Sequence, residues 1–199
     1  MLINIGLVLL GYLSGSITSA IIVCRILGRK DPRTMGSGNP GTTNVFRLYG
    51  WLAACLTLAG DLLKGAIPVF IAGLINAPDF IIAASGLMAF LGHLYPVFFN
   101  FKGGKGVATL TGIMLATYWV LGLAFIGTWL LMALIFRYSS LSSIAAALLS
   151  PLYCWLLLHT PAYIISFTSM AVLLVYRHRQ NVMNLIAGRE PRLGRVKPE

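Results

Sequence analysis

Two glycine-rich segments carry the residues of this chain that are best suited to chemistry. Segment 101–106 reads FKGGKG and lies between two long apolar runs, and segment 36–44 reads GSGNPGTTN and is followed by Arg47. Glycines let the backbone turn sharply and expose consecutive N–H groups, while lysine and arginine add positive charge. Together the two segments predict a site for an anionic, phosphorylated ligand.

A third polar cluster lies near the C-terminus, at residues 177–181. His178 and Asn181 are spaced i and i+3, so they can face one ligand together. Arg177 and Arg179 fit arginines whose charged ends snorkel to the membrane surface. With the serine-rich segment 137–143, the three clusters offer guanidinium, ammonium, hydroxyl, amide and backbone N–H donors, which is the donor set that phosphate oxygens require.

The chain lacks the residues that several catalytic mechanisms need. Glycine, and not serine or threonine, follows Lys105, which excludes a P-loop, and the patterns HExxH, GxSxG and the His-x4-Asp of many glycerolipid acyltransferases are absent. Five acidic residues are too few for a kinase-like Mg²⁺ site. We therefore expect no metal and no cofactor, and a site that binds and orients anions.

The rest of the chain is strongly apolar. Of its 199 residues 58% are hydrophobic and 10% are charged, with a mean hydropathy of +0.84. Several apolar runs are long enough to cross about 30 Å of hydrocarbon. We expect a single integral-membrane domain over residues 1–199, folded as an all-α polytopic helix bundle. Positive charges follow the first run instead of preceding it, so we interpret this run as a retained signal anchor.

Seven apolar segments, some of them short, alternate with connectors of two kinds. The connectors 25–50, 100–106 and 137–143 and the tail 177–199 carry Lys or Arg, whereas the intervening turns carry none. By the positive-inside rule, the N-terminus is outside and the basic tail is cytoplasmic. This asymmetry accounts for the net charge of +10 without nucleic acid as a partner. The predicted segments are 2–24, 51–75, 80–99, 107–118, 122–136, 144–158 and 162–176.

Three ionisable side chains fall inside the apolar segments, where charges usually face a bundle interior. Asp61 and Lys64 share one helix face. They either neutralise each other and fix helix packing, or shape the cytoplasmic pocket from behind. His93, eight residues before Phe101, is either hydrogen-bonded to a neighbouring helix or part of the site.

Three segments together resemble the motifs of one family. They are residues 36–47 (GSGNPGTTNVFR), 92–109 (GHLYPVFFNFKGGKGVAT) and 176–181 (YRHRQN). They are similar to the three cytoplasmic motifs of the bacterial membrane-integral glycerol-3-phosphate acyltransferases that use acyl-phosphate, the PlsY family. The resemblance covers almost the whole chain and departs from the family pattern at Asn184, where an arginine is usual.

The resemblance implies seven helices in the bacterial inner membrane and an active site on the cytoplasmic side. It implies transfer of a fatty acyl group from acyl-phosphate to the 1-hydroxyl of glycerol 3-phosphate, which yields lysophosphatidic acid and phosphate. This would be the first acylation of phospholipid biosynthesis, linked to an enzyme that forms acyl-phosphate. The catalytic residues would be Lys105, Arg47 and Ser37. The substrates would be bound by Asn39, Asn44, His93, Gly103, Gly104, Gly106, Ser143, His178 and Asn181.

Two other functions would use the same residues. A transporter for a small organic phosphate would place its binding residues near the bilayer midplane, commonly with inverted repeats, whereas here they cluster at one face. A structural subunit that contacts anionic lipid headgroups needs lysine and arginine, but no glycine or asparagine at fixed positions.

Overall fold

The structure is a computed structural model that describes residues 1–194. All regular structure in this part of the chain is helical, which confirms the predicted all-α class. The tail residues Arg195 and Lys197 lie outside the described residues. Two short 3-10 helices are η1 (Pro32–Thr34) and η2 (Val97–Phe99). The α-helices are α1 (Leu2–Gly15), α2 (Ser19–Ile26), α3 (Thr42–Leu74), α4 (Asp79–Leu94), α5 (Val107–Thr117), α6 (Trp119–Phe136), α7 (Ser139–Leu157), α8 (Pro161–Arg177) and α9 (Arg179–Ile186).

Each predicted apolar segment corresponds to a helix or to a bent pair of helices. Among residues 1–194, four helices are long and apolar enough to cross a membrane, namely α3, α4 with η2, α6 and α7. The pair α1 and α2, bent by 47°, makes a fifth if it counts as one span. Helices α5 and α8 are apolar but shorter. The number of seven spans and their orientation therefore stay predictions.

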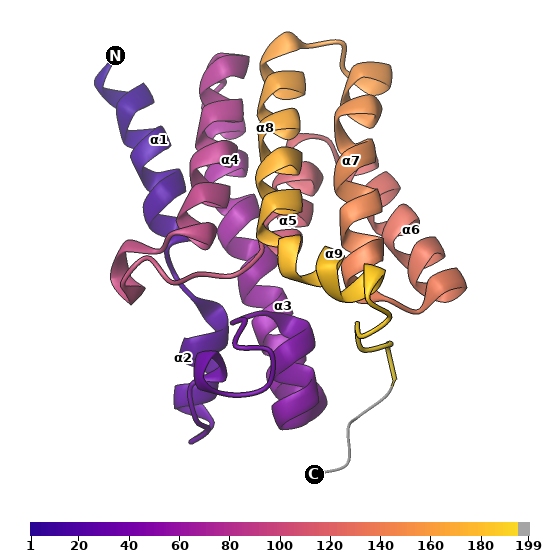
Figure 1. Cartoon of the computed structure of the whole chain (residues 1–199). Coiled ribbons are helices and arrows are strands. Elements are labelled where there is room, and N and C mark those ends of the chain that lie inside the picture. Colours follow the sequence, from indigo (N-terminus) through magenta and orange to yellow (C-terminus); the bar gives the residue numbers. More distant parts are fainter. Residues whose placement is uncertain (195–199) are drawn as a thin grey trace.

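The long helices lie side by side and end at two opposite faces of the bundle (Figure 1). Helix α1 packs on α4, α3 on α5, and α7 on both α6 and α8. Helix α9 crosses the lower ends of α8 and α7, at the same end as α2 and the start of α3, whereas the N-terminus lies at the other end (Figure 1). The polar segment between α2 and α3 and the polar segment after α8 therefore lie at the same face of the bundle.

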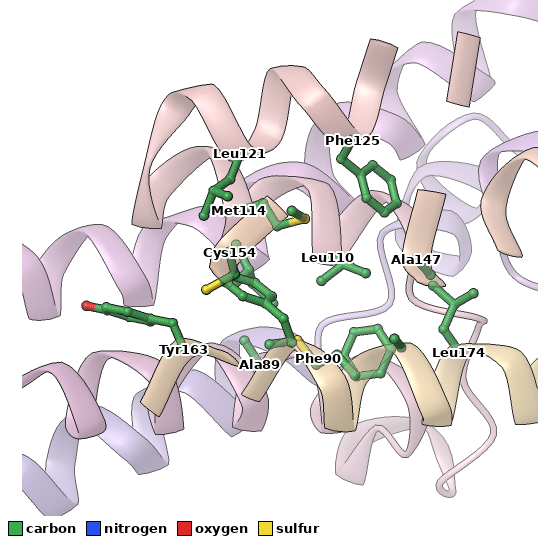
Figure 2. Close-up of a cluster of buried hydrophobic side chains, with 14 of the residues drawn as sticks. Ala89, Phe90, Leu110, Met114, Leu121, Phe125, Ala147, Cys154, Tyr163 and Leu174 are labelled. Carbon is green, nitrogen blue, oxygen red and sulfur yellow. The ribbon is translucent and has the colours of Figure 1, made fainter. Parts of the chain in front are cut away.

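Buried apolar side chains from several helices form the core (Figure 2). Phe90 of α4, Leu110 and Met114 of α5, Phe125 of α6 and Leu174 of α8 are at most 1% exposed. Because lipid tails are as apolar as these side chains, close packing between helices stabilises the bundle more than exclusion from water does.

Glycines allow the closest approaches between helices. A Cβ at Gly15 would overlap the backbone of Ala89, and a Cβ at Gly112 would overlap the backbone of Leu62. Small residues of this kind let backbones touch in membrane bundles. Gly15 allows α1 to lie close to α4, and Gly112 allows α5 to lie close to α3. Helices α4 and α5 flank the segment 95–106.

A helical stretch precedes the second predicted segment. Helix α3 starts at Thr42, but a break at Gly50, where φ is 81°, divides it, so the part after the break begins at residue 51 as predicted and Arg47 lies on the helical part before it. The reason is packing, since Val45 is fully buried against α2. The polar segment after Gly36 is therefore shorter than the sequence indicated, and Arg47 is held by a helix.

Three other predicted boundaries also shift. The first segment is broken between α1 and α2. The helix predicted over 80–99 ends at Leu94, because the residue before Pro96 is sterically driven out of the helical region. Ser143, predicted in the connector 137–143, lies in the first turns of α7. The site residues thus come from helix ends as much as from loops.

Candidate active site

One cavity of about 510 Å³ lies between the start of α3, the helices α5, α6 and α7, and the junction of α8 with α9. Ten of the twelve predicted site residues line it, and Gly103 and Gly104 do not. Residues from four separate parts of the chain therefore line one cavity. The ten are Ser37, Asn39, Asn44, Arg47, His93, Lys105, Gly106, Ser143, His178 and Asn181.

Asn44 shapes the N-terminal wall of the cavity. Its Oδ1 accepts a hydrogen bond from the backbone N–H of Ser37 at 3.0 Å. Its Nδ2 donates to the carbonyls of Pro32 at 3.0 Å and Met35 at 3.3 Å. Because the amide of Asn44 is already engaged with the loop backbone, its contribution to the site is to hold Ser37 at the cavity.

The glycine segment has two sides with different roles. A Cβ at Gly103 would overlap the carbonyls of His93 and Leu94, and a Cβ at Gly104 would overlap the His93 imidazole. Gly106 lines the cavity, has φ of 89° and caps α5, whose first residue is Val107. All three glycines thus allow close packing, since a Cβ at Gly106 would overlap the Phe90 ring, and the third one also ends the turn at the cavity.

Lys105 is held by the C-terminal cluster. Its Nζ donates to Oδ1 of Asn181 at 2.5 Å. Burial lowers the pKa of Lys105, and the nearby Glu190 carboxylate opposes that effect. The ammonium group is thus placed at the cavity by a residue 76 positions away.

Glu190 belongs to the candidate site although its sequence context does not predict this. Its Oε1 accepts hydrogen bonds from Ser140 at 2.6 Å and from Asn181 at 2.8 Å. Its Oε2 is buried and has no partner among residues 1–194, and Glu190 lines the cavity. A lone acidic residue in a basic tail carries no spacing pattern, so no local signal marks it.

His178 presents one ring nitrogen as an acceptor. Its Nδ1 lies 2.8 Å from the Leu174 carbonyl, and since a carbonyl can only accept, Nδ1 donates and Nε2 keeps its lone pair. Burial lowers the pKa of His178 to about 4, so the imidazole is neutral at pH 7. A neutral imidazole at the cavity can accept a hydrogen bond from a substrate hydroxyl.

The remaining polar wall comes from the start of α7. The Ser143 hydroxyl donates to the Ser139 carbonyl at 2.7 Å and accepts from Trp129 Nε1 at 3.0 Å.

Asn184, at the position where an arginine is usual in the family, lines the cavity too. Its Oδ1 accepts from Gln180 at 3.3 Å.

The other half of the cavity is apolar. The lining side chains come from α3, α5 and α6, and they lead away from the cationic residues into the helix bundle. They are Leu58, Leu62, Leu115, Phe125, Ile126 and Leu130. An amphiphilic molecule with an anionic head and a hydrocarbon tail matches this division.

Asp61, Lys64 and His93 form a buried group at the cavity. Lys64 Nζ lies 2.8 Å from Asp61 Oδ1 and donates to the Ile17 carbonyl at 2.8 Å. Asp61 and His93 line the cavity, and His93 Nδ1 lies 3.8 Å from Asp61 Oδ1. The two interpretations of the Asp61–Lys64 pair are therefore compatible. The two charges neutralise each other, and Asp61 also lines the cavity.

Asp61→Asn is expected to lower the free energy of unfolding by about 3–5 kcal/mol, because it leaves the Lys64 ammonium buried without its counter-charge. Thermal denaturation in detergent measures this effect. Asp31→Asn is the matched control, since the Asp31–Arg33 pair is 31% and 26% exposed and surface pairs contribute about 0–1 kcal/mol. Equal, small losses in both variants would contradict the prediction.

The cavity carries the cationic groups that an anion requires. Among residues 1–194, no three His, Cys, Asp or Glu side chains gather closely enough to hold a metal ion. Arg47 and Lys105 supply positive charge at the cavity, and the first N–H groups of α5 add the positive end of a helix dipole.

Comparison with known proteins assigns the family. The profile of the family described as glycerol-3-phosphate acyltransferase matches residues 5–188. The chain belongs to this family. A glycerol-3-phosphate acyltransferase of Methylococcus capsulatus is 53% identical over 183 residues, which is 92% of each chain. One from Thioalkalivibrio sulfidiphilus is 49% identical over 194 residues, covering 98% of this chain and 96% of that protein.

Solved structures agree with the family assignment. The fold matches crystal structures of PlsY, an integral membrane glycerol 3-phosphate acyltransferase. Its glycerol 3-phosphate form has a TM-score of 0.92 and 40% identity, with 96% of each chain covered. Its lysophosphatidic acid form has a TM-score of 0.90 and 38% identity, covering 96% of this chain and 95% of that one. The chain is a multi-pass membrane acyltransferase, as its sequence predicted.

Proposed function

We propose that this protein transfers a fatty acyl group from acyl-phosphate to the 1-hydroxyl of glycerol 3-phosphate. The products are lysophosphatidic acid and inorganic phosphate. One observation carries the proposal: a single cavity joins a cationic, hydrogen-bonding half to an apolar half. The family membership of the chain and the glycerol 3-phosphate and lysophosphatidic acid forms of PlsY support the same acceptor and product.

The donor lies across both halves of the cavity. Its acyl chain occupies the apolar half between α3, α5 and α6, and its phosphate reaches Lys105, Gly106 and the N-terminus of α5. This assignment rests on charge, because a helix N-terminus and an ammonium group both attract a phosphate. Arg47 lines the cavity from α3 and, as a guanidinium, binds the phosphate of glycerol 3-phosphate through two parallel hydrogen bonds.

The reaction needs little acid–base equipment from the protein. The 1-hydroxyl oxygen of glycerol 3-phosphate attacks the acyl carbonyl carbon, a new ester C–O bond forms, and the bond from that carbon to the phosphate oxygen breaks. The departing phosphate takes up the hydroxyl proton, so charge and atoms balance. Lys105 stabilises the charge that develops on the leaving phosphate, and His178 accepts a hydrogen bond that orients the hydroxyl. Ser37, held by Asn44, contacts the substrates from the N-terminal segment.

We further propose that the protein lies in the bacterial inner membrane with its active site facing the cytoplasm. The positive charge of the connectors next to the site supports this orientation. An enzyme that forms acyl-phosphate on the same side then supplies the donor.

A donor comparison tests the proposal. Purified protein in detergent is incubated with radiolabelled glycerol 3-phosphate and either palmitoyl-phosphate, palmitoyl-CoA or palmitoyl-acyl carrier protein. Labelled lysophosphatidic acid is expected with palmitoyl-phosphate alone. Product with palmitoyl-CoA alone would overturn the proposed donor, and the absence of product with every donor would favour a phosphate carrier.

Gly104→Ala is expected to lower kcat/KM for palmitoyl-phosphate more than about tenfold, since a displacement of about 1 Å at a reacting group can cost about 10²-fold. The added Cβ would overlap the His93 imidazole, so the backbone that leads into Lys105 must shift. Gly73→Ala is the control, because a Cβ there meets no atom within 4 Å. Initial rates of both variants measure the effect, and equal rates would refute the packing role.

A further inference from the structure

Arg177, the last residue of α8, binds the backbone of the glycine segment. Its Nη2 donates to the Gly103 carbonyl at 2.8 Å, and its Nε donates to the Gly104 carbonyl at 3.1 Å. The guanidinium carbon lies 5.6 Å from the centre of the Tyr95 ring. Arg177 does not line the cavity. The interpretation of Arg177 as a snorkelling arginine is therefore wrong, because its guanidinium donates hydrogen bonds to two carbonyls within the protein.

These contacts set the direction of two consecutive peptide units. In a planar trans peptide the N–H points opposite to the C=O. The unit that carries the Gly103 carbonyl is held at both ends, since its N–H, on Gly104, donates to the His93 carbonyl at 3.2 Å. The next unit carries the Gly104 carbonyl, so its N–H, on Lys105, points away from the guanidinium.

The backbone N–H of Lys105 is left for a ligand. Within residues 1–194 no backbone carbonyl accepts from it, although Lys105 lines the cavity. If the peptide unit between Gly104 and Lys105 turned over, the Gly104 carbonyl oxygen would take the place of the Lys105 N–H near the phosphate. A carbonyl dipole repels an anion at the place where an N–H attracts it.

We propose that Arg177 is a positioning residue that keeps the Gly104 carbonyl away from the donor phosphate and the Lys105 N–H directed toward it, while its hydrogen bond to the Gly103 carbonyl holds the preceding peptide unit in place. This inference rests on the proposed function, because the bound group is the phosphate of acyl-phosphate. Arg177 acts through the glycine segment and contacts no substrate. It couples the third sequence motif to the second.

Arg179 offers a matched comparison on the same stretch of chain. It carries the same charge two residues later and is exposed. Its guanidinium carbon lies 4.6 Å from the centre of the Tyr176 ring, and its Nη1 donates to the Tyr176 carbonyl at 3.3 Å. It makes no hydrogen bond to the glycine segment, so removing its charge changes the surface potential and leaves the loop unchanged.

The test compares Arg177→Gln, Arg177→Lys and Arg179→Gln with the unmodified protein, and measures kcat and both KM values. Arg177→Gln is expected to raise KM for palmitoyl-phosphate about tenfold, as the loss of charge-assisted hydrogen bonds predicts. Its KM for glycerol 3-phosphate should stay within about twofold. Arg177→Lys keeps the charge without the planar fork and should lie in between. Arg179→Gln should match the unmodified protein.

Several outcomes would overturn the positioning role. They are an unchanged KM for palmitoyl-phosphate in Arg177→Gln, an equal rise of both KM values, or a loss of kcat that follows a lower melting temperature. If Arg177→Gln does not fold, Arg177→Lys supplies the same comparison. Failure of the proposed function is distinguishable, because the unmodified protein would then make no product from palmitoyl-phosphate.

Discussion

Lys105→Ala is expected to lower kcat/KM for palmitoyl-phosphate by about 10³-fold, the upper range for removing one preorganised group that stabilises transition-state charge. The Lys105 ammonium lies at the cavity and is tethered to Asn181. No other lysine lines this cavity. Without it, negative charge develops on the leaving phosphate in a partly water-excluded site that lacks its nearest counter-charge.

Lys102→Ala separates this effect from a general loss of positive charge. Lys102 lies three residues earlier in the same segment, is exposed and does not line the cavity. Its variant is expected to keep its rate within about twofold, since exposed charges contribute little. Rates come from radiolabelled lysophosphatidic acid, and size-exclusion profiles in detergent report folding. A well-folded Lys105→Ala protein with near-normal turnover would contradict the proposed role of Lys105.

Arg47→Ala is expected to lower kcat/KM for glycerol 3-phosphate by about 10²-fold, mainly through a higher KM, because a bidentate phosphate contact is lost. Arg47 lines the cavity from the first turns of α3. Its guanidinium makes no ion pair with a carboxylate of residues 1–194. Its hydrogen-bonding capacity is therefore available to a ligand.

Two further variants test the geometry of this contact. Arg47→Lys keeps the charge but lacks the planar fork, so it should recover no more than about a tenth of the lost kcat/KM. Arg29→Ala removes an exposed arginine from the same connector that does not line the cavity, and it should leave KM unchanged. Full recovery by Arg47→Lys would show that only the charge at this position matters.

The fold class was accessible from the sequence because membrane helices are marked by local properties. Run length, hydropathy and the distribution of lysine and arginine predict an all-helical membrane protein without any knowledge of contacts. The helix boundaries were less accessible. Thr42 begins α3 because Val45 packs on α2, and a sequence with glycine, asparagine and proline at 36–44 gives no local sign of that contact.

Most residues of the candidate site were also predicted from the sequence. Arg47, Lys105, His178 and Asn181 were chosen by residue type and by motif, and the structure brings all four to one cavity. The sequence could not show that the side-chain amide of Asn44 forms its hydrogen bonds with the loop backbone. Hydrogen-bond partners depend on the fold, so residue type alone does not separate a ligand contact from a structural one.

The sequence by itself determined that this protein is a membrane-integral member of the glycerol-3-phosphate acyltransferase family, and it predicted ten of the residues that line the cavity. Only the tertiary structure decided which residues line the cavity and which ones hold the neighbouring backbone in place. It turned Gly103 and Gly104 toward packing, brought Glu190 to the cavity, and set Arg177 on carbonyls 74 and 73 residues away. The physical reason is that these roles arise from contacts between distant segments, whereas hydropathy and motifs are properties of neighbouring residues.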